Sequence, residues 1–373
     1  MFRRLQSGLP NDPVFPSDLQ KLGYFINEKD EIRNIQNPKQ YFHFFLSKNE
    51  RVNELQREAL NSATRSIVAE RLENLGLRLI RLPLGQEATD RHVPIFASSD
   101  LKSKKRIIIL FYEQQQDLGI LSYRIICGKG GINHGSVVNM VKFIQSTHCS
   151  PDSQDSPGII LANMGQLRWW RRGKKALTQN SWYTIPSKSL VDPCYQFDPK
   201  LNTVPGHEDT AQHVNYMFNH VIEELTDPEA VIDIIGVASG AYQVSWFLDD
   251  EKNWDKWNSR IAAFASVATY FTADQINNQK FKDWLVQRGR AYILSEEPCN
   301  SFLADAGGSK HTQPLGCPTF SLGESYYAEA MLPNGYETII NWFNEVAQSP
   351  NYANPTMVYT EAEATTKINE PTN

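Results

Sequence analysis

The stretch AVIDIIGVASGAYQVSWFL, residues 230–248, gives the clearest indication of the fold. Residues 230–237 form a nearly continuous apolar run with β-branched side chains, which is typical of a strand covered on both faces. Apolar residues then recur at helical spacing. A strand that turns into a helix with Ser239 at the corner predicts the nucleophile elbow of α/β-hydrolases. Centred on this serine, however, the motif GxSxG is VASGA, with a small residue in place of glycine on one side only.

Strand and helix patterns alternate along the rest of the chain. Strands are predicted around residues 77–83, 92–97, 105–113, 158–164, 261–271, 290–298 and 317–324. Amphipathic helices are predicted between them, the clearest over residues 214–225. The predicted fold class is therefore α/β: an α/β-hydrolase-like, mostly parallel, doubly wound sheet in one large domain. The strand of residues 232–237 has no polar face, so we expect it near the centre of the sheet.

Three parts of the chain are expected to differ in organisation. Residues 1–52 form an N-terminal lead-in with a hairpin in KLGYFINEKDEIRNIQ, packed on the main domain. Residues 53–347 form the α/β-hydrolase-like domain, which begins with a long helix. Residues 348–373 lose aromatic density and fill with Thr, Glu, Asn and Pro, which predicts a disordered tail.

Composition narrows the classes of protein. The chain has 373 residues and a formal net charge of −5, which argues against wrapping nucleic acid over its whole surface but allows a local basic patch. Its five cysteines are odd in number and form no CxxC pair, so no disulfide framework or zinc module is predicted. No apolar stretch approaches the roughly twenty residues that span a bilayer. We expect a protein of the nucleus and cytoplasm, with no cofactor and no metal.

A serine hydrolase needs an acid and a histidine besides Ser239. Glu296 and Glu297 follow a predicted strand at the place of the acid, although they read equally well as solvated loop charges. The last histidine, His311, precedes the final strand, whereas the base normally follows it. The loop EQQQDLG after the strand of residues 105–113 carries carboxylates that would oppose a developing oxyanion. Without a placed imidazole, a serine hydroxyl is a poor nucleophile.

Two other groups of residues have the composition of binding sites. QLRWWRRGKK, residues 166–175, interleaves cations and aromatic rings, which suits phosphates and bases. Its candidate contact residues are Arg168, Trp169, Trp170, Arg171, Arg172, Lys174 and Lys175. The other reading is a strand end with a packed tryptophan and cations in water. The group His207, Glu208, Asp209, His213 and His220 resembles a metal site in composition, but its spacing favours the flank of a helix.

Several motifs together resemble a known family. DPVFPSDLQKLGYFINEKDEIRNI, KNERVNELQREA, NMGQLRWWRRGKK, ILSEEPC and GCPTFSLGES resemble the fungal argonaute-binding protein two family, over about residues 10–347. Related domains occur at the C-terminus of some fungal histone deacetylases and in metazoan cotranscriptional regulators. The resemblance implies an α/β-hydrolase-like fold and a subunit of the argonaute siRNA chaperone complex, with argonaute and a further argonaute-binding subunit as partners. That complex holds duplex siRNA on argonaute and supports heterochromatin formation.

The same resemblance bears on catalysis. Metazoan relatives carry a serine at the elbow and a histidine in the final strand; Ser239 matches the first and Tyr327 stands at the second. The resemblance thus favours a non-catalytic scaffold in which Ser239 is a remnant and Tyr327 or Tyr326 fills or borders the vacated pocket. RNA contact would be indirect or through the basic patch. The alternative is a serine esterase or peptidase-like hydrolase, in which Ser239 uses His311 and Glu296 or Glu297.

Overall fold

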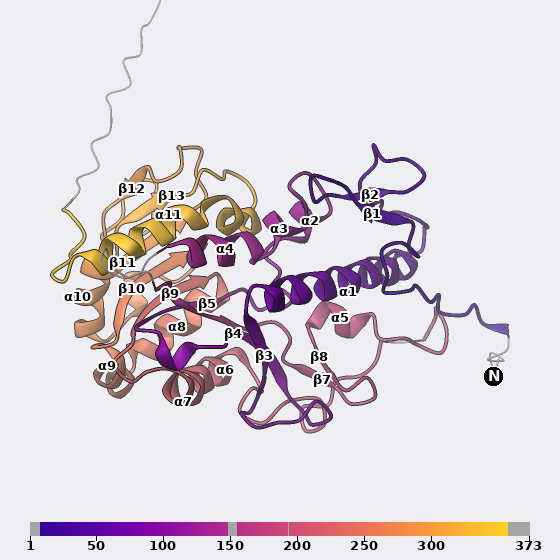
Figure 1. Cartoon of the computed structure of the whole chain (residues 1–373), viewed down its shortest axis with the longest axis horizontal. Coiled ribbons are helices and arrows are strands. Elements are labelled where there is room, and N and C mark those ends of the chain that lie inside the picture. The colour runs from indigo at the N-terminus through magenta and orange to yellow at the C-terminus, as the bar shows by residue number, and fades with distance from the viewer. Residues whose placement is uncertain (1–7, 148–154, 193, 357–373) are drawn as a thin grey trace, which may run out of the picture.

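A computed structural model describes residues 8–147, 155–192 and 194–356 of the chain. A nine-stranded sheet crosses its centre, in the order β12-β13-β11-β10-β9-β5-β6-β4-β3 (Figure 1). The strands are β3 (Leu77–Leu82), β4 (Val93–Ser98), β5 (Arg106–Phe111), β6 (Gly158–Ala162), β9 (Val231–Val237), β10 (Ile261–Val267), β11 (Gly289–Ile293), β12 (Phe302–Ala304) and β13 (Thr319–Ser321). The six strands from β13 to β6 run parallel, whereas β3, β4 and β12 pair antiparallel at the two edges.

Helices cover both faces of this sheet (Figure 1). One face is covered by α1 (Glu50–Asn74), α4 (Val138–Ser146) and α11 (Ala328–Gln348). The other is covered by α6 (Thr210–Tyr216), the π-helical turn η3 (Met217–Ile222), α7 (Glu223–Leu225), α8 (Ser239–Asp249), α9 (Glu251–Trp257) and α10 (Gln279–Arg288). The predicted doubly wound α/β-hydrolase-like fold is confirmed, and so is the central position of β9.

The central strands divide their side chains between two apolar cores. In β5, Ile108 and Leu110 point to the α1 side, while Ile107, Ile109 and Phe111 point to the α8 side. Every residue of β5 is buried. A parallel strand with helices on both faces needs apolar side chains in both directions, which explains why the runs in β5 and β9 lack a polar face.

The remaining helices and strands are short. They are β1 (Tyr24–Ile26), β2 (Ile32–Asn34), η2 (Leu101–Ser103), α2 (Tyr123–Ile126), α3 (Gly131–Gly135), β7 (Arg168–Trp170), β8 (Lys175–Leu177), α5 (Gln179–Tyr183) and η4 (Ala273–Gln275). The predicted hairpin is β1–β2. Its turn contacts the first residue of α3, where a Cβ at Gly131 would lie 2.2 Å from the carbonyl oxygen of Asp30.

The start of α1 connects three parts of the chain. The helix begins at Glu50, three residues before the predicted boundary, because the side chain of Asn49 caps the N–H of Arg51. The Arg51 guanidinium donates to both carboxylate oxygens of Asp12, at 3.0 and 2.6 Å. It also donates to the carbonyl oxygens of Tyr183 and Ile185 beside α5. The N-terminal segment, α1 and α5 therefore meet at one side chain.

The C-terminal boundary differs from the expected one. Tyr352 is buried, and its hydroxyl accepts hydrogen bonds from Trp342 Nε1 at 2.9 Å and Arg290 Nη2 at 3.1 Å. The Asn354 side chain donates to the carbonyl oxygen of Gly289 at 2.7 Å. Residues 349–354 of the predicted disordered tail are thus in contact with the domain, because one aromatic and one amide side chain find buried partners there. Residues 357–373 lie outside the described residues.

Candidate functional site

The direction of winding reverses between β5 and β9. After β5 the chain moves to β6 on one side, and after β9 it moves to β10 on the other. Ligands of open α/β sheets bind outside the carboxyl ends of the strands at such a reversal. In this protein, those ends are followed by the loop from Tyr112 and by the first turn of α8. This edge of the sheet is the place to look for a site.

The strand-to-helix corner after β9 has its apex at Ala238. This residue has φ 48° and ψ −113°, a backbone conformation that is strained for any residue other than glycine. Two glycines flank it at equal distance. A Cβ at Gly236 would lie 2.5 Å from Ala241 Cα, and one at Gly240 would lie 2.0 Å from the carbonyl oxygen of Phe111. The motif is therefore GVASG, residues 236–240, with alanine where GxSxG has its nucleophile.

This geometry corrects the expected position of the elbow serine. Ser239 is the first residue of α8, one position past the apex. It is 4% exposed, and its Oγ accepts a hydrogen bond from the backbone N–H of Gln114 at 2.8 Å. The hydroxyl thus joins the loop after β5 to α8. Among the described residues, no hydrogen bond links this hydroxyl to an imidazole.

The other candidate catalytic residues are not assembled around Ser239. Glu296 and Glu297 are exposed in the loop after β11. His311 is exposed between β12 and β13, where its backbone N–H donates to Ser309 Oγ. No hydrogen bond or ion pair joins these three side chains to Ser239 in the part of the chain that the structure describes. The alternative hydrolase reading therefore lacks its base and its acid in this arrangement.

The two tyrosines expected in a vacated pocket lie at the surface instead. Tyr326 is 76% exposed and Tyr327 is 44% exposed. The ring of Tyr327 packs under the guanidinium of Arg124, with the guanidinium carbon 4.0 Å from the ring centre. Arg124 is in turn paired with Glu329 at 2.9 Å. The expectation is wrong. Tyr327 lies at the surface before α11, where its ring gains a cation contact with Arg124.

The basic patch forms the hairpin of β7 and β8, residues 168–177. Trp169 is buried against His92, and the ring of Trp170 lies under the turn, 2.0 Å from where a Cβ of Gly173 would stand. Neither ring is free to stack on a base. Lys175 is exposed and lies over the Trp170 ring, where partial desolvation lowers its pKa.

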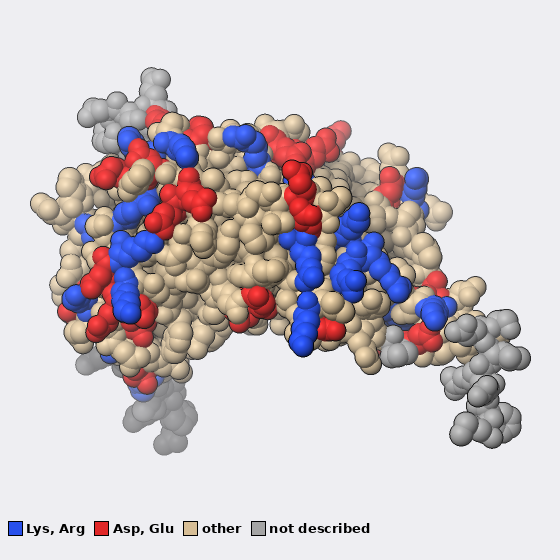
Figure 2. Space-filling model, turned by 90° about the horizontal axis from the view of Figure 1, so that it is seen from below, with Lys and Arg blue, Asp and Glu red and all other residues tan. Residues whose placement is uncertain are grey.

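The remaining cations of the hairpin face solvent. Arg171, Arg172 and Lys174 are exposed, and no ion pair is found for them among the described residues. Arg168 donates to Gln179 and lies over the ring of Phe197. Seen from below, lysine and arginine side chains gather right of centre, near the position of the hairpin in Figure 1 (Figure 2). The arrangement suits contacts with phosphates rather than with bases.

The histidine-rich segment forms a buried pair instead of a ligand set. His207 and His213 are fully buried, with their Nδ1 atoms 2.9 Å apart, so that one ring donates to the other. Burial lowers the pKa of His207 to about 4, and it also lowers the pKa of His213. Glu208 and Asp209 are exposed, and Asp209 caps α6. Within the described residues, no group of three or more His, Cys, Asp or Glu side chains is arranged to hold a metal ion.

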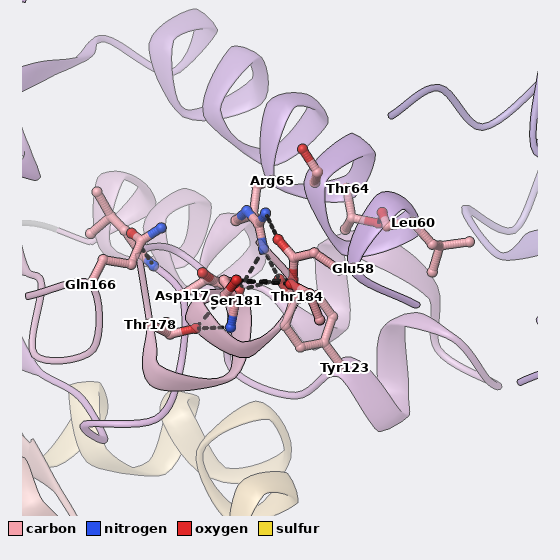
Figure 3. Close-up of polar contacts among 12 residues, drawn as sticks. Glu58, Leu60, Thr64, Arg65, Asp117, Tyr123, Gln166, Thr178, Ser181 and Thr184 are labelled. Carbon is pink, nitrogen blue, oxygen red and sulfur yellow. Dashed lines mark hydrogen bonds and ion pairs between the residues drawn. The ribbon is translucent and has the colours of Figure 1, made fainter. Parts of the chain in front are cut away.

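A polar cavity lies beside the loop after β5, and sequence reasoning missed it. Figure 3 shows side chains from α1 and from both ends of α5 converging on Asp117 and Tyr123. Its volume is 180 Å³, and its walls are Glu54, Arg57, Glu58, Asn61, Glu113, Gln115, Gln116, Asp117, Tyr123, Thr178, Asn180, Ser181 and Thr184. These residues come from three distant segments, so no local motif could have indicated the cavity.

Arg65 and Asp117 organise one wall of this polar cavity. Arg65 donates to Asp117 Oδ2 at 2.8 Å and to Glu58 Oε1 at 2.6 Å. The hydroxyl of Tyr123 donates to the same oxygen of Asp117 at 2.7 Å, and Ser181 Oγ donates to Glu58 Oε2 at 3.0 Å (Figure 3). Ion pairs and hydrogen bonds hold this wall in one geometry. Glu113 and Asp117 are the two carboxylates that were expected to oppose a developing oxyanion. Asp117 is paired with Arg65, and Glu113 lines this cavity.

The fold and the elbow together define an α/β-hydrolase-like protein with alanine at the nucleophile position. The family model of the Arb2 domain matches residues 15–299, and the chain belongs to this family. No curated protein is similar enough to give a match. The described helices include none that is both long and apolar enough to cross a membrane.

Solved structures of hydrolase enzymes are among those that resemble the chain at a low level. Carboxyl esterase 2 from the mycorrhizal fungus Tuber melanosporum is 10% identical, with a TM-score of 0.35 over 73% of this chain and 85% of that one. MGS-M1, an α/β-hydrolase enzyme from a deep-sea metagenome library of the Medee basin, is 9% identical, with a TM-score of 0.31 over 73% and 99%. AbyA5 is 8% identical, with a TM-score of 0.38 over 78% and 77%. We draw nothing about chemistry from these similarities.

Proposed function

We propose that this chain is a non-catalytic scaffold subunit of an argonaute siRNA chaperone complex. It binds argonaute and a further argonaute-binding subunit, and it serves small-RNA-mediated heterochromatin formation and gene silencing in the nucleus and cytoplasm. The family supports a role in argonaute binding. The observation that carries the non-catalytic part is Ala238 at the apex of the elbow, where a methyl group replaces the attacking hydroxyl.

The catalytic part of the proposal is tested with a fluorophosphonate probe, which labels only activated serines. Wild type and Ser239→Ala are expected to stay unlabelled, beside an active serine hydrolase as positive control. Ser239→Ala removes the acceptor of the Gln114 N–H, so a loss of about 1–2 kcal/mol in stability is expected and measured separately. Labelling of wild type that is lost in the alanine variant would return the protein to the hydrolases.

The assembly part is tested by co-purification of argonaute with a tagged chain. Wild type and Ser239→Ala are both expected to recover argonaute and small RNA. If the alanine variant keeps its fold and loses argonaute, Ser239 has a direct role that the scaffold reading does not contain.

Any RNA contact is assigned to the exposed cations of the β7–β8 hairpin. The variant Arg171→Glu, Arg172→Glu, Lys174→Glu is expected to weaken retention of small RNA and to flatten its salt dependence. A matched control reverses Lys29, Lys142 and Lys252, which are exposed elsewhere on the surface. Equal retention by the two reversed proteins and wild type would leave only indirect contact with RNA.

A further inference from the structure

The polar cavity carries more negative charge than its own cations balance. Four carboxylates line it: Glu54, Glu58, Glu113 and Asp117. Arg57, also in the wall, pairs with Glu54, and Arg65 is shared by Glu58 and Asp117. Lys175 approaches from a neighbouring cavity that shares Glu58 and Ser181 with this one.

Glu113 has no cationic partner among the described residues. Its pKa is raised by burial, with a smaller contribution from the charge of Glu329. Glu54 behaves similarly, since burial raises its pKa in spite of Arg57. A positive group in the cavity would stabilise the charged forms of both carboxyl groups.

Two oxygens of the wall have no hydrogen-bond partner among the described residues. Asp117 Oδ1 is one of them, on a side chain that is only 5% exposed and whose other oxygen is fully used. Asn61 Oδ1 is the other. A buried acceptor without a donor destabilises the folded protein. Each of these oxygens can accept a hydrogen bond from an N–H group of a ligand.

The volume limits what the ligand is. Pockets for cofactors and drug-sized molecules span about 300–1,000 Å³, and this cavity has 180 Å³. A single side chain or a small organic ion is the appropriate size. A divalent cation is not favoured, because the described residues offer no group of three ligating side chains.

We propose that the polar cavity binds the guanidinium group of an arginine side chain from a partner polypeptide. A guanidinium is planar and has five donors, so it bonds several separated acceptors at once, whereas an ammonium acts as a point charge. Asp117 Oδ1, Asn61 Oδ1 and the Glu113 carboxylate are the acceptors available to it. One wall of the cavity is the loop after β5, in which the backbone N–H of Gln114 donates to Ser239 at the elbow. The inference goes beyond the proposed function and is tested on the isolated chain.

The test measures binding of acetyl-arginine amide by isothermal titration calorimetry. Acetyl-citrulline amide, nearly the same shape without the charge, is the control ligand. We expect the arginine compound to bind at least tenfold more tightly, which corresponds to one charge-assisted hydrogen bond of about 1.4 kcal/mol or more. Equal affinity for the two compounds, or no detectable binding of either, would overturn the proposal.

Two variants locate the site. Glu113→Gln and Asn61→Leu, neither of which breaks an ion pair of the wall, are each expected to weaken binding of the arginine compound about tenfold. Glu73→Gln, an exposed carboxylate on the same helix as Glu54, is the matched control and should leave affinity unchanged. Unchanged affinity in both cavity variants would place any binding elsewhere and refute the assignment. Denaturation curves confirm that each variant is folded.

n-Butylguanidine separates two sources of the guanidinium. It has the same head group and the same single charge without the peptide flanks. Tighter binding of acetyl-arginine amide than of n-butylguanidine supports a polypeptide partner. The reverse order would indicate a free small cation and overturn the partner part of the proposal. Failure of this inference leaves the fluorophosphonate and co-purification results of the proposed function untouched.

Discussion

Acidification should destabilise the protein through the buried pair of His207 and His213. Both rings are fully buried, and neither Nε2 atom has a hydrogen-bond partner in the part of the chain that the structure describes. The Tyr216 ring packs 4.5 Å from His207, with the ring of the exposed His220 on its other side. An extra proton on the pair would therefore be buried without an acceptor. No carboxylate forms an ion pair with either buried ring among the described residues.

The magnitude follows from the shift in pKa. The pKa of His207 is about 4 in the folded protein and about 6.5 in an unfolded chain. Because the folded value is the lower one, the unfolded chain takes up its proton first as the pH falls. The contribution is thus complete above about pH 6.5 and is lost toward pH 4. Linkage gives a loss of about 2 kcal/mol at pH 5 from His207 alone, and His213 adds to it with the same sign.

Urea unfolding, followed by tryptophan fluorescence at pH 7.5 and pH 5.0, measures this loss. The double variant His207→Leu, His213→Leu should lose at least about 2 kcal/mol less than wild type over this interval. Carboxyl groups titrate in both proteins and cancel in the comparison. His311→Asn, on an exposed ring outside this pair, is the control and should behave as wild type. An equal loss in the double variant would show that the pair does not titrate as inferred.

Three further predictions concern the elbow and the C-terminal segment. Gly240→Ala should destabilise the protein by about 3 kcal/mol or more in urea unfolding, because the new methyl group meets backbone atoms of Phe111; a neutral effect would disprove the close contact. Ala238→Gly should raise stability by about 1 kcal/mol by relieving the positive φ, and a lower melting temperature would contradict the strain. Tyr352→Phe should cost about 1–3 kcal/mol, since Trp342 and Arg290 lose an acceptor; unchanged stability would return residues 349–354 to the tail.

Much of the fold was predictable because local patterns carry it. The apolar runs of β5 and β9 follow from two covered faces, and the hairpin of residues 24–34 follows from a turn between two short strands. The nine-stranded order and the antiparallel edge strand β12 depend on pairing between distant segments, which no local pattern states.

The elbow shows how a site was misplaced by one residue. Centring the motif on Ser239 gives VASGA. The two glycines four residues apart, Gly236 and Gly240, instead centre it on Ala238. The signal was present in the spacing of the glycines. Its physical content, close approach of the helix to the strand and to β5, appears only in three dimensions. In the β7–β8 hairpin, likewise, only packing in three dimensions buries Trp169 and partly buries Trp170.

The contacts of Arg51 make distant parts of the chain thermodynamically linked. One guanidinium holds Asp12 of the N-terminal segment and two carbonyl groups beside α5. The same α1 and α5 supply two walls of the polar cavity. A partner that pulls residues 10–12 from Arg51 leaves a charge-assisted network unmade and loosens α5 against α1. If this changes the affinity of the cavity by some factor, a ligand in the cavity must change the affinity for that partner by the same factor.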